Sequence, residues 1–190
     1  MKSVLLVLGI IIIGAIIAGS YFFGIRNDLV RQQNDVKGKW AQVDNDLKRR
    51  ADLIPNLVET VKGFAKQEQT VFGDVAAARS KLLNAPTPQT KIEANNQLSG
   101  ALGRLLVIQE RYPELKSNEN FLRLQDELAG TENRIAISRR DYNDAITKYN
   151  TDIELFPKNI AAGMFGFHRN DAYFKTTEEE RKVCLLYTSP

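Results

Sequence analysis

The chain has 190 residues, a length typical of one domain with an additional short element rather than two domains. Its 26 basic and 23 acidic residues give a formal net charge of +3. The composition therefore lacks the strong basic excess of nucleic-acid-binding domains, and we expect no nucleic-acid partner. The single cysteine excludes an intramolecular disulfide, and the single histidine excludes metal centres that need two imidazoles.

The N-terminal run from Ser3 to Ile25 contains no charge and is rich in Val, Leu and Ile. It is long enough to cross the ~30 Å hydrocarbon core of a bilayer as a helix, which predicts a transmembrane anchor over residues 1–25 and a lipid partner. The alternative is a cleaved signal peptide, because Ala18-Gly19-Ser20 is a small-residue cleavage pattern. The apolar run exceeds the ~7–15 residues of a signal core, which favours the anchor.

Basic residues flank this run unequally. Lys2 precedes it, while Arg26, Arg31, Lys37 and Lys39 follow it. Because positive charge near a span stays on the cytoplasmic side, we expect a short external N-terminus and a cytoplasmic domain.

Residues 40–65 predict an amphipathic helix, since apolar side chains recur there at steps of three and four. The apolar positions are Val36, Trp40, Val43, Leu47, Ala51, Ile54, Leu57, Val58, Val61 and Ala65. Pro55 lies within this pattern and predicts a kink or a break, with Asp52 as the cap of a new helix. Gly38, Gly63 and Gly73 come without other turn residues and predict points of close helix packing.

Helical periodicity continues to Leu83, and residues 84–88 form the clearest break. A second helix is predicted from about Gln89 to Tyr112, and a third begins after a cap at Ser117 or Asn118. Thr131 and Ser138 fall on the otherwise apolar seam of this third helix. The pattern predicts an all-α, up-and-down antiparallel bundle over residues 26–156, with three to four long helices in coiled-coil-like packing, depending on Pro55.

Residues 157–183 differ in composition and form an aromatic and acidic tail. The tail is predicted either to fold back towards the bundle or lipid headgroups, or to pack in the core. Residues 184–190 resemble translated read-through at the end of a gene fragment, and we expect that the native C-terminal residues are missing.

Lys48, Arg49, Arg50 and Asp52 are the first candidate binding residues. They can contact phosphate, acidic lipid or an acidic partner. Alternatively they belong to a solvated salt-bridged face, with the i,i+4 pairs Asp44/Lys48 and Asp46/Arg50.

A third arrangement is a buried network that joins Arg49 or Arg50 to Glu127 or Glu132, which requires full pairing of the charges. No histidine follows a glutamate at the spacing of di-iron bundles, and no nucleophile elbow or phosphate loop occurs. We therefore expect no catalytic residue, no metal and no cofactor.

The segment from Trp40 to Val58 resembles the signature of the LemA family of bacterial membrane proteins. Further matching blocks are Val61-Lys62-Gly63-Phe64-Ala65, Tyr112 to Phe121, Leu124 to Leu128, Thr131 to Ile135, Arg139 to Asn143, Phe156-Pro157 and Phe165-Gly166-Phe167. The resemblance implies a single-span protein of the bacterial inner membrane that carries a helical bundle. It implies no reaction, because the family has no established activity.

The leading hypothesis is a membrane-anchored scaffold or adaptor without catalytic activity. Its protein partner is expected to contact Lys48, Arg49, Arg50 and Asp52, with Asn118, Glu119 and Asn120 as secondary candidates. The alternative is a sensor or regulatory subunit of a membrane enzyme, such as a protease, that responds to a small ligand or ion. A hydrolase or transferase is disfavoured, and the sequence does not indicate an oligomeric state.

Overall fold

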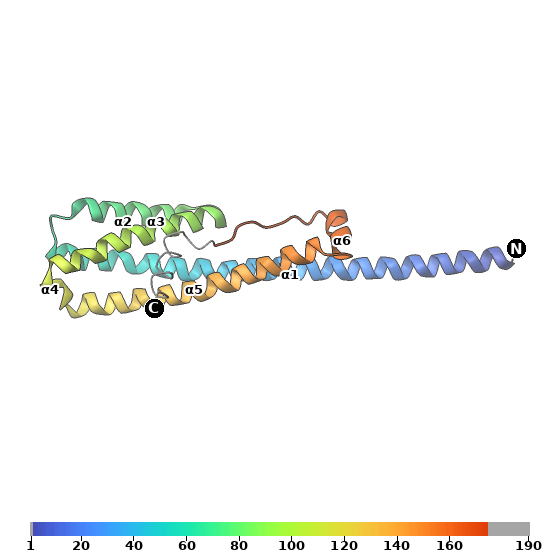
Figure 1. Ribbon diagram of the computed structural model, residues 1–190, viewed down its shortest axis with the longest axis horizontal. Helices are drawn as coiled ribbons and strands as arrows, with labels where there is room; N and C mark the ends of the chain where they lie inside the picture. The colour runs from blue at the N-terminus through green and yellow to red at the C-terminus, as the bar shows by residue number, and fades with distance from the viewer. Residues whose placement is uncertain (1, 175–190) are drawn as a thin grey trace, which may run out of the picture. The chain divides into compact units, whose positions relative to one another are not determined.

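The computed structural model describes residues 2–174, and this part of the chain is helical without strands. The predicted all-α fold is confirmed. The glutamate run 178–180 and the unusual residues 184–190 lie outside the described residues. Figure 1 shows the helices in chain order: α1 (Lys2–Phe64), α2 (Gln69–Asn84), α3 (Pro88–Val107), the 3₁₀ turn η1 (Ile108–Arg111), α4 (Pro113–Lys116), α5 (Glu119–Glu154) and α6 (Lys158–Phe165).

The chain divides into two compact units. Within the described residues, the bundle unit comprises residues 40–143 and 172–174, and the anchor unit comprises residues 2–39 and 144–171. The long helices α1 and α5 each contribute residues to both units.

The long elements of the bundle unit are the later part of α1, helices α2 and α3, and the earlier part of α5, and the short η1 and α4 lie between α3 and α5. Helices α2 and α3 pack against each other, joined by the short connection at residues 85–87 (Figure 1). Of the apolar positions predicted within residues 40–65, all except the half-buried Trp40 are buried in the core. Its fully enclosed side chains include Leu47, Ile54, Leu57, Leu82, Leu98, Leu105, Phe121, Ile135 and Tyr142.

Two helices in this unit start at a side-chain cap, of which the second was predicted. Helix α3 begins with Pro88 after Thr87, whose side chain accepts a hydrogen bond from the Thr90 amide in a capping box. The Asn118 side chain accepts a hydrogen bond from the Phe121 amide at 3.0 Å, which makes Asn118 the predicted cap of α5. The break expected at residues 84–88 is confirmed, since residues 85–87 separate α2 from α3, whereas residues 113–116 of the second predicted loop form the short helix α4.

The first turn of the chain, between α1 and α2, does not lie at Pro55. Pro55 lies inside α1, which continues to Phe64, so the predicted break and the capping role of Asp52 are wrong. Pro55 is exposed while Ile54 and Leu57 are buried, so the apolar face holds the helix together across the proline. The chain instead turns at residues 65–68, which return α2 to the core through Phe72 and Val75.

The three glycines of this region do not mark close packing. A Cβ atom added at Gly38, Gly63 or Gly73 would meet no neighbouring atom within 4 Å. The prediction of tight helix contacts there is wrong.

In the anchor unit, the short helix α6 packs against α1. Ala161 and Ala162 of α6 are buried against Ile25 and Leu29 of α1, with Phe22, Ile153, Phe165 and Phe167 packed around them. Alanine side chains permit a close approach of the two helices, while the surrounding aromatic rings supply buried apolar area.

The N-terminal part of α1 carries the apolar run. Within the described residues, α1 is the one helix that is long and apolar enough, by length and composition, to cross a membrane. None of its most apolar window is buried inside the protein. An apolar surface of this length without protein cover suits a lipid environment.

The segment after α6 is held by asparagine side chains of α5. The Asn150 amide donates to the Asn170 carbonyl at 2.7 Å and accepts from the Asn170 amide at 2.9 Å. In the bundle unit, Asn143 forms the same pair of bonds with the backbone of Phe174, at 2.8 and 3.0 Å. Phe174 is buried beside Trp40 and Tyr142, so this end of the tail packs in a core cluster.

Candidate functional site

The candidate site is organised by Arg50, a buried side chain of α1. Its Nη1 donates to Asn95 Oδ1 at 2.9 Å and to Ser99 Oγ at 3.1 Å, both on α3. The same nitrogen lies 3.1 Å from Glu132 Oε2 on α5. One guanidinium thus connects three helices, and the predicted arginine–carboxylate network exists between Arg50 and Glu132.

The environment of Arg50 weakens its hold on the proton. Burial is the largest influence and lowers the pKa of the guanidinium, Glu132 opposes this, and the nearby Arg139 lowers the pKa further. A buried charge is tolerated when its hydrogen-bonding capacity is used, which explains the two neutral acceptors beside the carboxylate.

Asp46 is also internal rather than part of a solvated face. It is buried, and its Oδ2 accepts from Ser138 Oγ at 2.6 Å and from Gln42 Nε2 at 3.3 Å. Ser138 is one of the two predicted polar seam residues, so this bond explains its place in the seam. The predicted Asp46/Arg50 pairing is wrong, because both side chains have partners on other helices.

The exposed part of the basic segment consists of Lys48, Arg49 and Asp52. These residues border a shallow hollow of about 580 Å³ along α1, together with Asn45, Asp46 and Leu53. Asp44 forms its ion pair with Lys91 of α3 rather than with Lys48, so the second predicted helical pair is also wrong. Asp52 lies 3.9 Å from Arg79 Nη2 of α2.

A second hollow of about 320 Å³ lies between α3 and α5, next to Arg50. Its apolar lining residues are Leu102, Gly103, Leu106, Leu128 and Ala129, and its polar lining residues are Arg50, Ser99, Gln125 and Glu132. Glu132 Oε2 is buried and forms no hydrogen bond of good geometry. This combination can hold a small molecule with an apolar body and one polar group.

The secondary candidates, Asn118, Glu119 and Asn120, lie at the start of α5. Asn118 is engaged as the helix cap, whereas Glu119 and Asn120 are exposed in the first turn. Glu119 precedes Glu132 by thirteen residues, which is ~20 Å along a helix. The structure therefore does not bring these residues to the Arg50 site.

Sequence reasoning missed Asn95 and Ser99 as partners of Arg50. Asn95 is buried and lies on the predicted apolar face of its helix, three residues from both Ile92 and Leu98. A polar residue at a core position requires a partner, and this is the signal that could have identified it.

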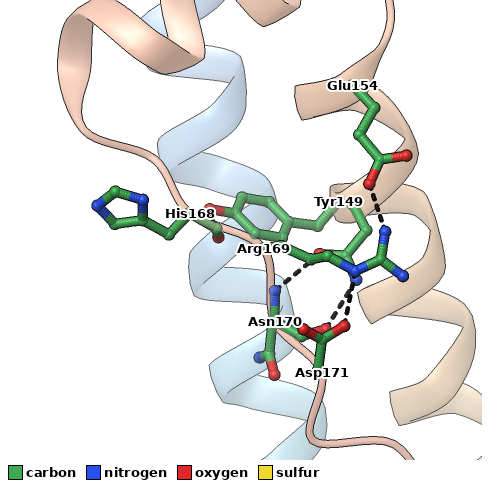
Figure 2. A network of polar contacts seen from close by, with 7 residues as sticks. Tyr149, Glu154, His168, Arg169, Asn170 and Asp171 are labelled. Carbon is green, nitrogen blue, oxygen red and sulfur yellow. Dashed lines mark hydrogen bonds and ion pairs between the residues drawn. The ribbon is translucent and has the colours of Figure 1, made fainter.

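The anchor unit has a polar network of its own (Figure 2). Buried Tyr149 donates its hydroxyl hydrogen to the His168 carbonyl at 3.0 Å, and burial raises the pKa of Tyr149. Arg169 pairs with Glu154 and with Asp171. His168 contributes its backbone to this network rather than a metal-binding imidazole. Over residues 2–174, no group of three or more His, Cys, Asp or Glu side chains is arranged to hold a metal ion.

Comparisons with known proteins identify similarity to LemA proteins and to magnetosome proteins. A sequence model described as the LemA family matches residues 39–185. The chain is 28% identical to Protein LemA of Metamycoplasma hominis, over 86% of this chain and 76% of the relative. It is 27% identical to Magnetosome protein MamQ 2 of Paramagnetospirillum magneticum, over 78% of this chain and 64% of the relative. It is 25% identical to Magnetosome protein MamQ of Magnetospirillum gryphiswaldense, over 75% and 62%. The chain thus spans slightly under two thirds of these magnetosome relatives.

The Arg50 network predicts unequal effects at adjacent arginines. We expect Arg50→Met to lower the free energy of unfolding by about 2–4 kcal/mol, because it leaves Asn95, Ser99 and Glu132 without their shared partner. The matched change Arg49→Met alters an exposed side chain and is expected to change the free energy of unfolding by less than about 0.5 kcal/mol. Urea unfolding of both variants in the same detergent measures the difference. Equal destabilisation by the two changes would contradict a structural role specific to Arg50.

Proposed function

The chain belongs to the LemA family and is a membrane-associated protein of the LemA type, and we propose that it acts as a membrane-anchored helical scaffold or adaptor without catalytic activity. One observation carries this proposal. Helix α1 is continuous from Lys2 to Phe64, so the exposed apolar run and the core residues of the bundle unit belong to one helix. A helix shared in this way carries both the membrane anchor and part of a folded core in one element.

The partner surface in this proposal is the exposed basic edge of α1. Lys48 and Arg49 have no ion pair within the described part of the chain, so their charges are available to a partner. Arg50, just behind them, is engaged in the bundle and acts by holding α1 in place. An acidic protein surface matches this edge, since complementary charge guides association and register. Glu119 and Asn120 are a separate exposed region that a large partner can also reach.

Charge reversal at the basic edge tests the partner. We expect Lys48→Glu/Arg49→Glu to abolish photo-crosslinks formed in cells from a benzoyl-phenylalanine placed at Asn45, an exposed residue of the same hollow. Helix content and melting temperature should stay unchanged, because both side chains are exposed. The control Lys66→Glu/Arg123→Glu introduces the same charge change at other exposed positions and should retain the crosslinks. Crosslinks that survive the first pair of changes would contradict the assigned surface.

The proposed location is the bacterial inner membrane, with residues 1–25 as a single-pass anchor and the bundle in the cytoplasm. The support is the group of basic residues after the apolar run, at Arg26, Arg31, Lys37 and Lys39. The membrane potential, negative on the cytoplasmic side, also favours a cytoplasmic position of these positive charges.

Sidedness is tested with a cysteine at exposed Asn34, introduced together with Cys184→Ser. A membrane-impermeant maleimide should label Asn34→Cys only after the inner membrane has been opened, if the bundle is cytoplasmic. A cysteine in a known external loop of another inner-membrane protein serves as the positive control. Labelling of intact spheroplasts at residue 34 would reverse the proposed orientation.

A second candidate function follows from the hollow between α3 and α5. Its apolar walls and its single Arg50–Glu132 ion pair favour a small amphiphilic ligand, as in a sensor or regulatory subunit of a membrane enzyme such as a protease. A ligand in this site contacts two helices that Arg50 also connects. Binding there is therefore coupled to the packing of α1, α3 and α5.

Gly103 offers a direct test, because it lines the hollow and a Cβ atom there would meet no atom within 4 Å. Octanoate or octylamine is expected to raise the melting temperature of the full chain, since a ligand bound to the native state stabilises it by mass action. Gly103→Leu should fill the hollow and remove this shift. Gly73→Leu is the control, because Gly73 also faces open space on a helix but does not line the hollow. The absence of a shift with both amphiphiles would count against the second function.

A further inference from the structure

Four large apolar side chains are exposed together at the junction of α5 and α6. Leu155 and Phe156 come directly after the end of α5, and Ile160 and Met164 follow one helical turn apart on α6. Their exposed fractions are 56%, 79%, 45% and 69%. We call these four residues the α6 face. An apolar group of this size on a folded protein indicates contact with a partner or with lipid.

The two members of the α6 face that belong to the helix, Ile160 and Met164, lie on the side of α6 that the rest of the protein does not cover. Ala161, Ala162 and Phe165 occupy the opposite side and pack against α1. The alternation of exposed Ile160 and Met164 with these buried residues follows the helical repeat. Helix α6 therefore has apolar residues on two sides, of which only one is covered by the rest of the protein.

The position of α6 along α1 identifies the environment of the exposed side. Its buried residues contact Ile25 and Leu29, which are the last residue of the uncharged run and a residue one turn later. The Phe165 ring lies 6.4 Å from the Phe23 ring, and Arg26 lies 5.8 Å from the Phe165 ring centre. Helix α6 is thus attached where the apolar run meets the first charge. This is the level at which a membrane span reaches the headgroups, where aromatic residues and arginine concentrate.

Polar contacts fix α6 in this position. Lys158, the first residue of α6, pairs with Asp28 of α1 at 2.8 Å and with Asp152 of α5. Gln32 of α1 donates hydrogen bonds to both of these aspartates. The hydrogen bonds to Asp152 and Asp28 raise the pKa of Lys158, so the lysine stays charged and paired through the neutral range.

We propose that the α6 face is a second membrane contact, which inserts into the boundary between headgroups and acyl chains in the leaflet where the α1 span ends. The proposal rests on the anchoring of α1 in the bilayer. Its occupant is lipid rather than protein, because α6 packs on α1 at the end of the apolar run, against Ile25 and beside the exposed Phe23 ring. Interfacial elements of this kind bury their apolar side chains ~5–10 Å into the boundary region. Such a contact restricts the rotation of α1 about its own axis.

The test uses the full chain with Cys184→Ser and one new cysteine, labelled with the fluorophore NBD and reconstituted in phosphatidylcholine–phosphatidylglycerol vesicles. Met164→Cys reports on the α6 face. Ile13→Cys reports on the middle of the span. Asn34→Cys is an exposed control on α1, nine residues after Ile25 and therefore ~14 Å further along the helix. Nitroxide lipids carry the quencher either at the headgroup or deep in the acyl chain.

The label at residue 164 is expected to show blue-shifted emission relative to residue 34 and a greater loss of intensity with the headgroup nitroxide. The label at residue 13 should lose more intensity with the deep nitroxide. If residue 13 is quenched while residue 164 matches residue 34 in emission and quenching, the α6 contact is wrong and the anchor stands. If residue 13 is not quenched by either lipid, the anchoring proposal and this inference both fail.

Discussion

The packing of the bundle unit depends on the hydrogen bonds and the ion pair that the buried guanidinium of Arg50 forms. Arg50 lies on α1 among core residues such as Leu47 and Ile54, yet its partners come from α3 and α5. A charge in this position destabilises any arrangement in which those partners are absent. The same requirement that makes Arg50 expensive to bury therefore selects one register of α3 and α5 against α1. The Asp46–Ser138 bond adds a second polar constraint one turn earlier on the same helix.

The apolar core was predictable because its signal is local and repeated. Leu47, Ile54, Leu57 and Phe121 each fall on a face that the three-and-four spacing identifies, and each is buried. The polar interior was predictable only in part. The Arg50–Glu132 pair was among the alternatives, whereas Asn95 and Ser99 were missed because a pattern of apolar residues does not reveal which helix faces which.

The ends of the helices were also predictable only where a short-range interaction determines them. Thr87 and Asn118 were identifiable as boundaries because a cap is a short-range interaction between a side chain and its own helix. The turn at residues 65–68 was not, since Lys66, Gln67 and Glu68 are good helix formers. Burial of Phe72 and Val75 against the core outweighs this local preference. Pro55 gives the opposite case, in which burial on both sides of the residue outweighs a local helix breaker.

Helix α1 consists of an apolar run without protein cover and a later part that packs against other helices. Its apolar run has no protein cover, so in water it would expose a large apolar surface. In lipid, that run satisfies its backbone polar groups within the helix, as a membrane requires. Beyond Ile25 the helix becomes polar on most sides, and its order there comes from packing against other helices. Because the two parts are consecutive turns of one helix, helical order in each part removes the cost of nucleating the other.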